Sequence, residues 1–186
     1  MNNKEMTKRR ELDFDPIQVA QDHWRQRSWA AAAPSIGVVT SVMRAQQIFV
    51  IQADEVLESF GLTFARWEVL VLLSFARKGT LAAGKISERL QVHPASITNS
   101  INRLERAGYV RRMSDPSDGR GRLIKITPAG VTLAKAATET LNAQFLEKIE
   151  LTVNECHQLF RLLRKVRLAA GDFVPHATDR RETMVT

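Results

Sequence analysis

The chain has 186 residues, of which 44% are hydrophobic, and this suits one compact domain with an arm. It has no run of roughly 18 apolar residues and its N-terminus lacks the apolar middle of a secretory signal, so we expect no membrane span and no export. The single cysteine, Cys156, excludes an internal disulfide framework and favours a cytoplasmic location. A net charge of +7 favours polyanionic partners such as nucleic acid.

The N-terminal segment predicts a flexible arm and an extra helix. Residues 1–14 are mostly polar or charged, which is typical of an arm. Asp15 can cap a helix that begins at Pro16, because proline suits the first helical turn. We expect this helix over 15–33, since Pro34 disfavours a helical residue before it.

The next two segments predict longer helices. Over 36–60, apolar residues recur at steps of three and four, and Gly61 follows as a helix terminator. The recurring residues are Val42, Ala45, Phe49, Ala53, Val56 and Phe60. Residues 64–78, with Thr63 as the expected cap, are apolar nearly all round, which predicts a helix deep in the core.

Two short helices separated by a tight turn are expected next. The first is "LAAGKISERLQ", and the second is "VHPASITNSINRLERAG", with Pro94 in its first turn and Gly108 just past its end. Only the residues "VHP" lie between the two helical patterns. Two short helices joined in this way are typical of a helix-turn-helix.

The periodicity then changes to that of strands. The segments "YVRRM" and "RLIKIT" are strand-like, and the link "SDPSDGRG" between them is rich in turn residues. We therefore expect a two-stranded β-hairpin after the helix-turn-helix.

The C-terminal third predicts two helices and a tail. Thr127 and Pro128 restart a helix that extends to about residue 150. The segment "TVNE", from Thr152 to Glu155, is a capping box that opens a last helix, expected to end near residue 170. The polar residues 173–186 are expected to form a flexible tail.

The second short helix has two chemically different sides. Ile97, Ile101 and Leu104 share one side, which predicts packing on the core. The other side carries methyl, hydroxyl and amide groups and a guanidinium, which contact thymine methyl groups and hydrogen-bond to bases or phosphates in the major groove of DNA. The candidate contacts on this helix are Pro94, Ala95, Ser96, Thr98, Asn99, Asn102 and Arg103.

Basic residues gather around the hairpin. Residues 84–125 contain nine basic and four acidic residues, most of the excess charge in under a quarter of the chain. Arg120 at the hairpin tip is expected to enter the minor groove, with Asp118 orienting its guanidinium through hydrogen bonds. Arg111, Arg112 and Arg122 are the candidates for phosphate contacts.

The stretches "WEVLVLL", "GKISERLQVHPASITNSINRLERAGYVRR" and "DPSDGRGRLIKITPAG" resemble the MarR family of winged-helix transcriptional regulators. The helix-turn-helix, a hairpin with an Asp-x-Arg turn, and the restart "ITPAG" occur in the family's order. The resemblance extends over residues 36–170. By position, it places the family's DNA contacts on the helix over 94–103 and on Arg120.

This resemblance implies a fold that is mainly α with a small β-hairpin wing. A winged helix-turn-helix over 63–127 is flanked by long dimerisation helices over 34–62 and 128–172. The family also implies a homodimer that binds a pseudo-palindromic operator in double-stranded DNA. Repression is then relieved by a small ligand or by oxidation.

The extra N-terminal helix is similar to one in relatives that respond to urate or related anionic metabolites. Trp24 resembles a tryptophan on that helix, Glu68 matches an acidic residue after the core-helix tryptophan, and Arg111 or Arg112 matches an arginine at the start of the wing. A further arginine of those relatives is replaced by Ser100. The resemblance therefore favours a different anionic effector, such as a small carboxylic acid.

Two more residues are candidates for the ligand pocket. Arg44 lies among apolar neighbours and needs a partner, which is either a bound anion or Glu68. His93 either lines the pocket or only caps the helix that starts at Pro94. The main candidates are Trp24, Arg44, Glu68, His93 and Arg112, and His23 is a further one.

Other functions fit the sequence less well. Cys156 could sense peroxide, but the neighbouring Glu155 disfavours its thiolate. The chain lacks a Gly-rich phosphate loop, a nucleophile elbow and metal-ligand spacing among its histidines, so we expect no enzyme, no cofactor and no metal site. A basic protein can also bind RNA or a membrane surface, yet the membrane alternative predicts a basic amphipathic helix instead of a basic hairpin. The sequence is best interpreted as a cytoplasmic, dimeric DNA-binding repressor.

Overall fold

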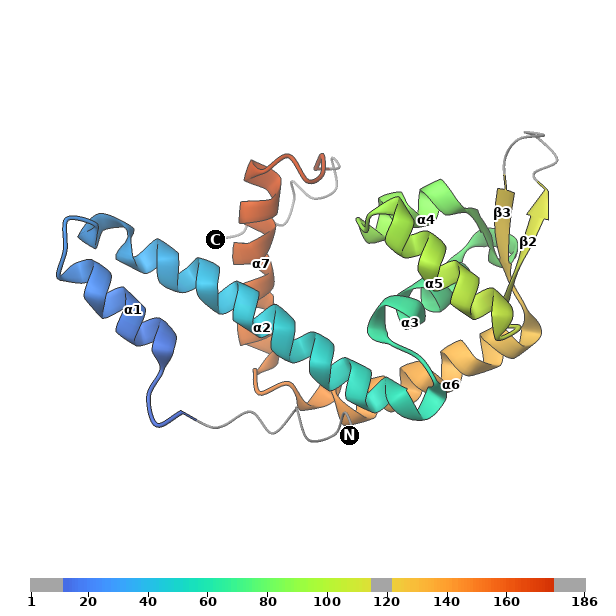
Figure 1. The fold of residues 1–186 in the computed structure, drawn as a ribbon, viewed down its shortest axis with the longest axis horizontal. Helices are drawn as coiled ribbons and strands as arrows, with labels where there is room; N and C mark the ends of the chain where they lie inside the picture. Colours follow the sequence, from blue (N-terminus) through green and yellow to red (C-terminus); the bar gives the residue numbers. More distant parts are fainter. Residues whose placement is uncertain (1–11, 115–121, 176–186) are drawn as a thin grey trace. The chain divides into compact units, whose positions relative to one another are not determined.

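The structure is a computed structural model that describes residues 12–114 and 122–175. The chain divides into two compact units, one that ends at Phe145 and one that begins at Leu146. Helices dominate both units, and a small antiparallel sheet belongs to the first unit (Figure 1). This confirms the predicted fold class. The expected arm up to residue 11, the hairpin tip and the tail beyond residue 175 lie outside the described residues.

The N-terminal helix is shorter than expected. Helix α1 spans Pro16–Arg25, and the Asp15 carboxylate caps it by accepting a hydrogen bond from the backbone N–H of Ile17 at 2.9 Å. A 3₁₀ turn, η1 at Ala30–Ala32, then leads into α2, which spans Ala33–Leu57. The predicted end near residue 33 is wrong because a proline also suits the first turn of a new helix, and Pro34 lies in the first turn of α2.

Gln21 joins α1 to α2, and the two helices lie side by side (Figure 1). Its amide Nε2 donates to the carbonyl oxygen of Ala33 at 3.0 Å. Gly37 leaves room for this side chain, since a Cβ at that position would lie 1.9 Å from Gln21 Nε2. The contact therefore depends on a glycine inside α2.

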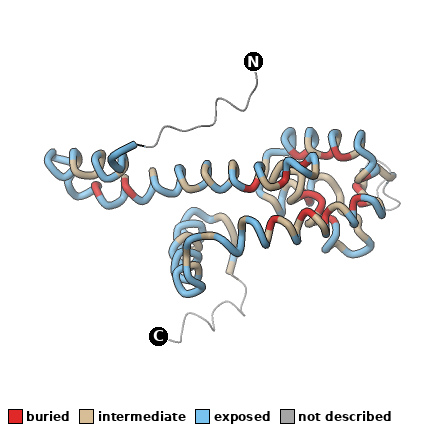
Figure 2. The backbone as a smooth tube through the Cα atoms, turned by 90° about the horizontal axis from the view of Figure 1, so that it is seen from below, coloured by how far each residue is buried: buried red, intermediate tan, exposed pale blue. Residues whose placement is uncertain are grey.

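Helix α2 is mostly exposed along its N-terminal two-thirds (Figure 2). The stretch Ala30–Phe60 is long and apolar enough to span a membrane by length and composition, with a mean hydropathy of 1.2 over 18 residues, of which 11% are buried. We expected no membrane span because the sequence has no run of roughly 18 apolar residues, and Arg44 and Gln47 do interrupt this stretch. Its exposed apolar side chains include Val38, Val39, Val42, Met43 and Phe49.

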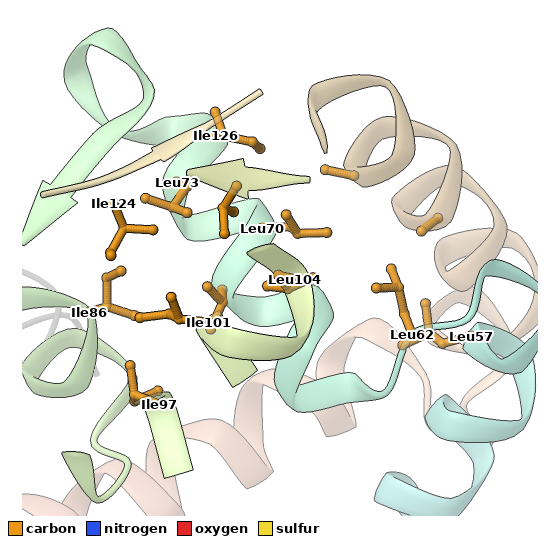
Figure 3. Packing of buried hydrophobic residues seen from close by; sticks show 14 of the residues in the cluster. Leu57, Leu62, Leu70, Leu73, Ile86, Ile97, Ile101, Leu104, Ile124 and Ile126 are labelled. Atoms are coloured by element: carbon orange, nitrogen blue, oxygen red, sulfur yellow. The ribbon is translucent and has the colours of Figure 1, made fainter. Parts of the chain in front are cut away.

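Helix α3, at Phe64–Phe75, follows a 3₁₀ turn, η2 at Glu58–Phe60, and passes through the core (Figure 3). Its residues Val69, Leu70 and Leu73 are fully buried. The expectation of burial all round is wrong, because Phe75 lies opposite this buried stripe and is 82% exposed, and Ala65 and Ser74 are exposed as well. Thr63 precedes the helix as expected, but its side chain makes no capping hydrogen bond.

The sheet has three strands where a two-stranded hairpin was expected. Strands β2 at Val110–Ser114 and β3 at Arg122–Ile126 form the hairpin, and β1 at Thr80–Ala82 pairs with the other edge of β3. All pairs are antiparallel. Strand β1 follows a 3₁₀ turn, η3 at Arg77–Gly79, and three residues are too few to show an alternating pattern in the sequence.

The helix-turn-helix is confirmed. Helix α4 spans Ala83–Leu90 and α5 spans Pro94–Arg106. Gln91 takes a left-handed backbone conformation with φ of 53°, which ends α4. The Ser87 hydroxyl donates to the carbonyl oxygen of Val92 at 2.6 Å, so a side chain of α4 stabilises the turn.

Helix α6 restarts directly after the hairpin and spans Pro128–Gln144. The Thr127 hydroxyl caps it by accepting from the backbone N–H of Gly130 at 3.1 Å. A Cβ at Gly130 would lie 2.2 Å from the carbonyl oxygen of Tyr109, so the close approach of hairpin and helix requires glycine here. The helix ends before the expected residue 150 because the Phe145 backbone leaves the helical region.

The second unit contains a 3₁₀ turn, η4 at Leu146–Lys148, and helix α7 at Val153–Ala169. The predicted capping box between Thr152 and Glu155 is confirmed, with both reciprocal hydrogen bonds present. No residue of α7 is buried. Its exposed apolar side chains are Val153, Leu159, Phe160, Leu162, Val166 and Leu168.

Candidate nucleic-acid interface

Helix α5 is attached to the core by its inner side, as expected. Ile97, Ile101 and Leu104 are at most 3% exposed and belong to the core cluster with Ile86 of α4 and Leu70 of α3 (Figure 3). These buried positions set the rotation of the helix about its axis. The remaining positions therefore face away from the core.

The outward side of α5 carries small and neutral polar groups, and the one acid of the helix, Glu105, lies near its C-terminal end. The exposed residues are Pro94, Ala95, Ser96, Thr98, Asn99 and Arg103, and Asn102 is half-buried. The Thr98 hydroxyl donates to the carbonyl oxygen of Pro94 at 2.9 Å, so its oxygen remains an acceptor. The side chains of Asn99 and Arg103 make no hydrogen bond or ion pair with any described residue, so their donors are available to bases or phosphates.

An imidazole caps the N-terminus of α5. His93 Nδ1 accepts a hydrogen bond from the backbone N–H of Ala95 at 3.2 Å, while Pro94 has no N–H that needs a partner. Of the two roles that the sequence leaves open for His93, capping is the one with a contact in the described chain. The exposed N-terminus of a helix attracts phosphate groups.

The side chains of Asn102, Glu105 and Arg112 form one hydrogen-bonded network between α5 and β2. The Arg112 guanidinium donates to Glu105 Oε2 through Nη1 and to Asn102 Oδ1 through Nη2, the latter at 2.7 Å. The backbone N–H of Arg112 also donates to Glu105 Oε1 at 3.0 Å. Arg112 therefore neutralises the acid of α5 and connects the helix to the wing.

The strands of the wing present free basic groups. Arg111 and Arg122 are exposed and make no hydrogen bond or ion pair with the described part of the chain. Arg111 lies directly opposite Lys125 on the neighbouring strand, and like charges in this position favour an anionic partner. Asp118 and Arg120 lie outside the described residues, so their minor-groove role stays a prediction.

An ion pair offsets the exposed acid of α4. Lys85 Nζ lies 2.7 Å from Glu88 Oε2, and this hydrogen bond and the charge of Lys85 lower the pKa of the Glu88 carboxyl. Arg89 acts in the same direction through its charge. The helix that precedes α5 therefore adds little negative potential near the interface.

The residues expected in a ligand pocket do not come together within one chain. Trp24 lies beside Ala32 at the start of α2, whereas Glu68 lies on α3, which Asp54 contacts near the end of α2. Ala33 and Asp54 are separated by about 30 Å of helix at 1.5 Å per residue. Trp24 and Glu68 therefore cannot both contact one small molecule in a single protomer.

Arg44 and Arg112 have partners other than the expected ones. Arg44 is exposed on α2 and donates to Gln47 Oε1 at 3.3 Å, so the pair with Glu68 that the sequence offered as an alternative is wrong. Its exposure removes the need for a buried anion. Arg112 is engaged in its network with α5, away from Trp24 on α1.

Glu68 is half-buried, and the loss of water around its carboxyl raises its pKa. It makes no hydrogen bond or ion pair with any residue that the structure describes. A half-buried carboxyl without a partner is more easily protonated than an exposed one. At neutral pH, where Glu68 is ionised, its burial therefore lowers the stability of the folded state.

A shallow cavity of about 360 Å³, largely open to solvent, lies at the corner between α1 and α2. Two indole rings dominate it, with ring centroids 5.4 Å apart, and the Arg27 guanidinium lies 5.9 Å from the ring centroid of Trp29. The cavity is lined by Trp24, Ser28, Trp29, Ala31 and Ala32. It therefore offers an apolar, aromatic surface beside a cation.

Cys156 lies half-buried in α7, and its Sγ is 3.9 Å from the carbonyl oxygen of Leu151. The Glu155 carboxylate turns to Thr152, whose hydrogen bonds lower the pKa of that carboxyl. Cys156 is thus a half-buried helix residue whose thiol contacts the backbone just before its own helix.

Sequence reasoning missed two parts of the site. Glu105 was not singled out, although Asn102 lies three residues before it on the same side of α5, a spacing at which helical side chains are neighbours. Arg27 and Ser28 were also missed, because no sequence signal showed that the chain turns between Arg25 and the next helix.

Comparisons with known proteins agree on one family. A family model described as MarR family matches residues 60–121. The HTH-type transcriptional regulator PapX of Escherichia coli is 30% identical over 118 residues, which cover 62% of this chain and 71% of PapX.

Solved structures show the same similarity. Sco5413, a MarR family transcriptional regulator from Streptomyces coelicolor, is 45% identical with a TM-score of 0.70, over 76% of this chain and 99% of that chain. A mutant of MarR from Escherichia coli, complexed with operator DNA, is 25% identical with a TM-score of 0.65, over 73% of this chain and 96% of that chain.

Proposed function

The chain belongs to the MarR family of DNA-binding transcriptional regulators, and from this premise we propose that it is a homodimeric, cytoplasmic repressor. Members of this family are not enzymes. In this proposal, a small anionic ligand releases the repressor from a pseudo-palindromic operator. The observation that carries the proposal is the outward side of α5, where small and neutral polar groups are exposed and the helix's acid is paired with Arg112. Such a side can approach base edges without repelling phosphates.

The proposed DNA contacts divide into two groups. Ser96, Thr98 and Asn99 near the start of α5 contact bases in the major groove, while Arg103, Arg111 and Arg122 contact phosphates. The wing-tip residues Asp118 and Arg120 keep their proposed place in the minor groove.

Dimerisation is supported by exposed apolar residues in each unit. Val38, Val42 and Met43 on α2 are between 40% and 61% exposed, and Phe160 and Leu162 on α7 are 60% and 65% exposed. Apolar surface of this kind is covered in obligate dimers. A two-fold dimer presents two copies of α5, which match the two half-sites of a pseudo-palindromic operator.

Selection of bound fragments from the genome of origin tests the DNA-binding part. The dimer should enrich fragments with an inverted repeat, and a mobility shift with an enriched fragment should persist over excess nonspecific duplex. RNA or anionic liposomes that compete as well as the enriched duplex would support the alternative partners. Failure to enrich any sequence would remove the regulator proposal.

The cavity at Trp24 and Trp29 supports the ligand part of the proposal. Its aromatic walls fit the apolar body of a small carboxylic acid, and Arg27 can pair with the carboxylate. If the ligand binds better when the two copies of α5 no longer fit successive major grooves, ligand and operator affinities are negatively coupled. Glu68 is then not a contact of the same molecule in one protomer.

Salicylate and benzoate are suitable probes of this cavity. Either should quench tryptophan fluorescence in the native protein and lower operator affinity, and Trp24→Leu should weaken both effects. Arg27→Met should weaken carboxylate binding but leave operator affinity without ligand unchanged. Oxidation of Cys156 by peroxide that releases the operator, with no response to carboxylates, would favour the redox alternative.

A further inference from the structure

The hydrogen-bond partner of Asn102 fixes which way its side-chain amide points. A guanidinium can only donate, so the Asn102 atom that Arg112 Nη2 meets at 2.7 Å is the carbonyl oxygen. The amide –NH₂ therefore points away from Arg112 and β2. It donates to no residue in the described part of the chain.

Asn102 lies at the edge of the side of α5 that is proposed to face DNA. At about 100° per residue, Asn99 is near the middle of the outward side, and Asn102 lies between Asn99 and Glu105 on the side of β2. With its oxygen turned to the wing and its –NH₂ turned away, Asn102 offers only donors to a molecule that approaches the outward side.

Arg112, which sets the orientation of the Asn102 amide, is itself held in place by Glu105. Glu105 accepts from its backbone N–H and from its Nη1, so the guanidinium is fixed from two directions. The Arg112 and Glu105 side chains are only 26% and 35% exposed, which limits competition from water. The orientation of Asn102 is thus set by a charge-paired group and not by the amide itself.

We propose that Arg112 is a positioning residue that makes Asn102 a donor-only reader of the major groove, so that Asn102 selects guanine over adenine. This inference rests on the proposed entry of α5 into the major groove. An unrestrained asparagine pairs with adenine through both its oxygen and its nitrogen. Guanine presents the acceptors N7 and O6 side by side, which suit the two hydrogens of a fixed –NH₂.

Selection from a randomised duplex library measures the preference at every operator position. The native dimer should prefer guanine over adenine by about tenfold at one position in each half-site. Asn102→Ala should abolish the preference at that position and leave the others unchanged. Arg112→Met should free the Asn102 amide and shift the preference at that position to adenine.

A second variant guards against a loss of structure in Arg112→Met. Arg112→Lys keeps the ion pair with Glu105 but lacks a second rigid branch for Asn102, so it should also shift the preference to adenine. Arg111→Met is the matched control, because it removes a charge from the next residue of the same strand. It should weaken binding to all sequences equally and leave the base preferences unchanged.

Three results would overturn the inference. The preference for guanine could persist in Arg112→Met and Arg112→Lys, both folded by circular dichroism, which would show that Asn102 is not positioned by Arg112. Asn102→Ala could leave every base preference intact, which would show that Asn102 does not contact a base. A native protein that selects no sequence would contradict the proposed function, and this inference with it.

Discussion

The Asp54 carboxylate of α2 accepts a hydrogen bond from the backbone N–H of Phe64 at 2.6 Å, and so caps α3 from another helix. The residue expected to cap α3, Thr63, instead accepts from Arg66 Nε at 3.1 Å. A carboxylate at this place satisfies an N–H that lacks a helical partner and also complements the helix dipole. One side chain therefore holds α2 against the helix at the centre of the core.

Replacing Asp54 should destabilise the fold measurably. Asp54→Ala is expected to lower the free energy of unfolding by about 1–2 kcal/mol, because a capping group and its bond between two helices are lost. Asp54→Asn keeps an acceptor and should retain most of that stability. Urea unfolding followed by circular dichroism measures both variants. Equal stability of the alanine variant and the native protein would show that Asp54 is not the effective cap.

Gly130 is expected to tolerate no side chain. A Cβ there would meet the carbonyl oxygen of Tyr109 at 2.2 Å, and this neighbour is backbone that cannot rotate away. Gly130→Ala should therefore lower the free energy of unfolding by about 1–3 kcal/mol and separate the hairpin from α6.

Gly84→Ala is the matched control for this substitution. Gly84 lies in α4 with nothing within 4 Å of an added Cβ, so alanine should stabilise the helix by about 0.5–1 kcal/mol. Thermal unfolding should place the two variants on opposite sides of the native protein. A shift of both variants in the same direction would contradict the packing described for Gly130.

Local patterns predicted most elements, but not the contacts that join them. Asp15 before Pro16, and Thr152 three residues before Glu155, predicted helix starts that the structure confirms, because capping acts within a few residues. The end of α1 was missed because Pro34 suits both a break and a new start.

The candidate site shows the same division. The inner side of α5 followed from the spacing of Ile97, Ile101 and Leu104, and burial confirms it. The bond from Arg112 to Asn102 crosses from the wing to the helix, and no spacing in the sequence indicates which arginine of the wing turns inward. The cap by Asp54 likewise depends on how two helices pack.

Substitutions of His93, which caps α5, should separate effects on stability from effects on DNA affinity. His93→Ala should lower the free energy of unfolding by about 0.5–1 kcal/mol, because the N–H of Ala95 loses its acceptor. His93→Asn restores an acceptor and should recover this loss. His93→Asp should be as stable as the asparagine variant yet bind duplex DNA more weakly, because it brings a negative charge near phosphates.

Unfolding in urea and fluorescence anisotropy with a labelled duplex separate these two effects for His93. Equal DNA affinities of the asparagine and aspartate variants would argue against phosphate groups at the N-terminus of α5.

The ionised Glu68 carboxylate should lower the free energy of unfolding at neutral pH. Burial raises its pKa above the ordinary value of 4.5, so the folded state binds the proton more tightly than the unfolded state. Its contribution to stability therefore falls as the pH rises from that ordinary value through the raised one. Glu68→Gln should be more stable than the native protein at pH 7, and this gain should shrink as the pH approaches 4.

Glu88→Gln is the control of opposite sign. Lys85 lowers the pKa of Glu88, so its small contribution is present above the ordinary value and is lost as the pH falls. Urea midpoints of both variants at pH 4 and pH 7 test the contrast. A gain for Glu68→Gln that does not depend on pH would show that packing, and not ionisation, controls the effect.

Asn99 and Arg103 should affect DNA binding in different ways if α5 enters the major groove. Both side chains are exposed and unpaired within the described residues, but only Arg103 carries a charge. Asn99→Ala should reduce the preference for the operator over nonspecific duplex with little change in the salt dependence of binding. Arg103→Ala should weaken binding to all sequences and reduce the slope of log K against log salt concentration by about 0.9, because one phosphate contact is lost. Arg120→Ala is expected to weaken binding mainly at A·T-rich outer positions. Anisotropy titrations over a range of salt concentrations measure both quantities, and identical profiles for Asn99→Ala and Arg103→Ala would contradict the division between base and phosphate contacts.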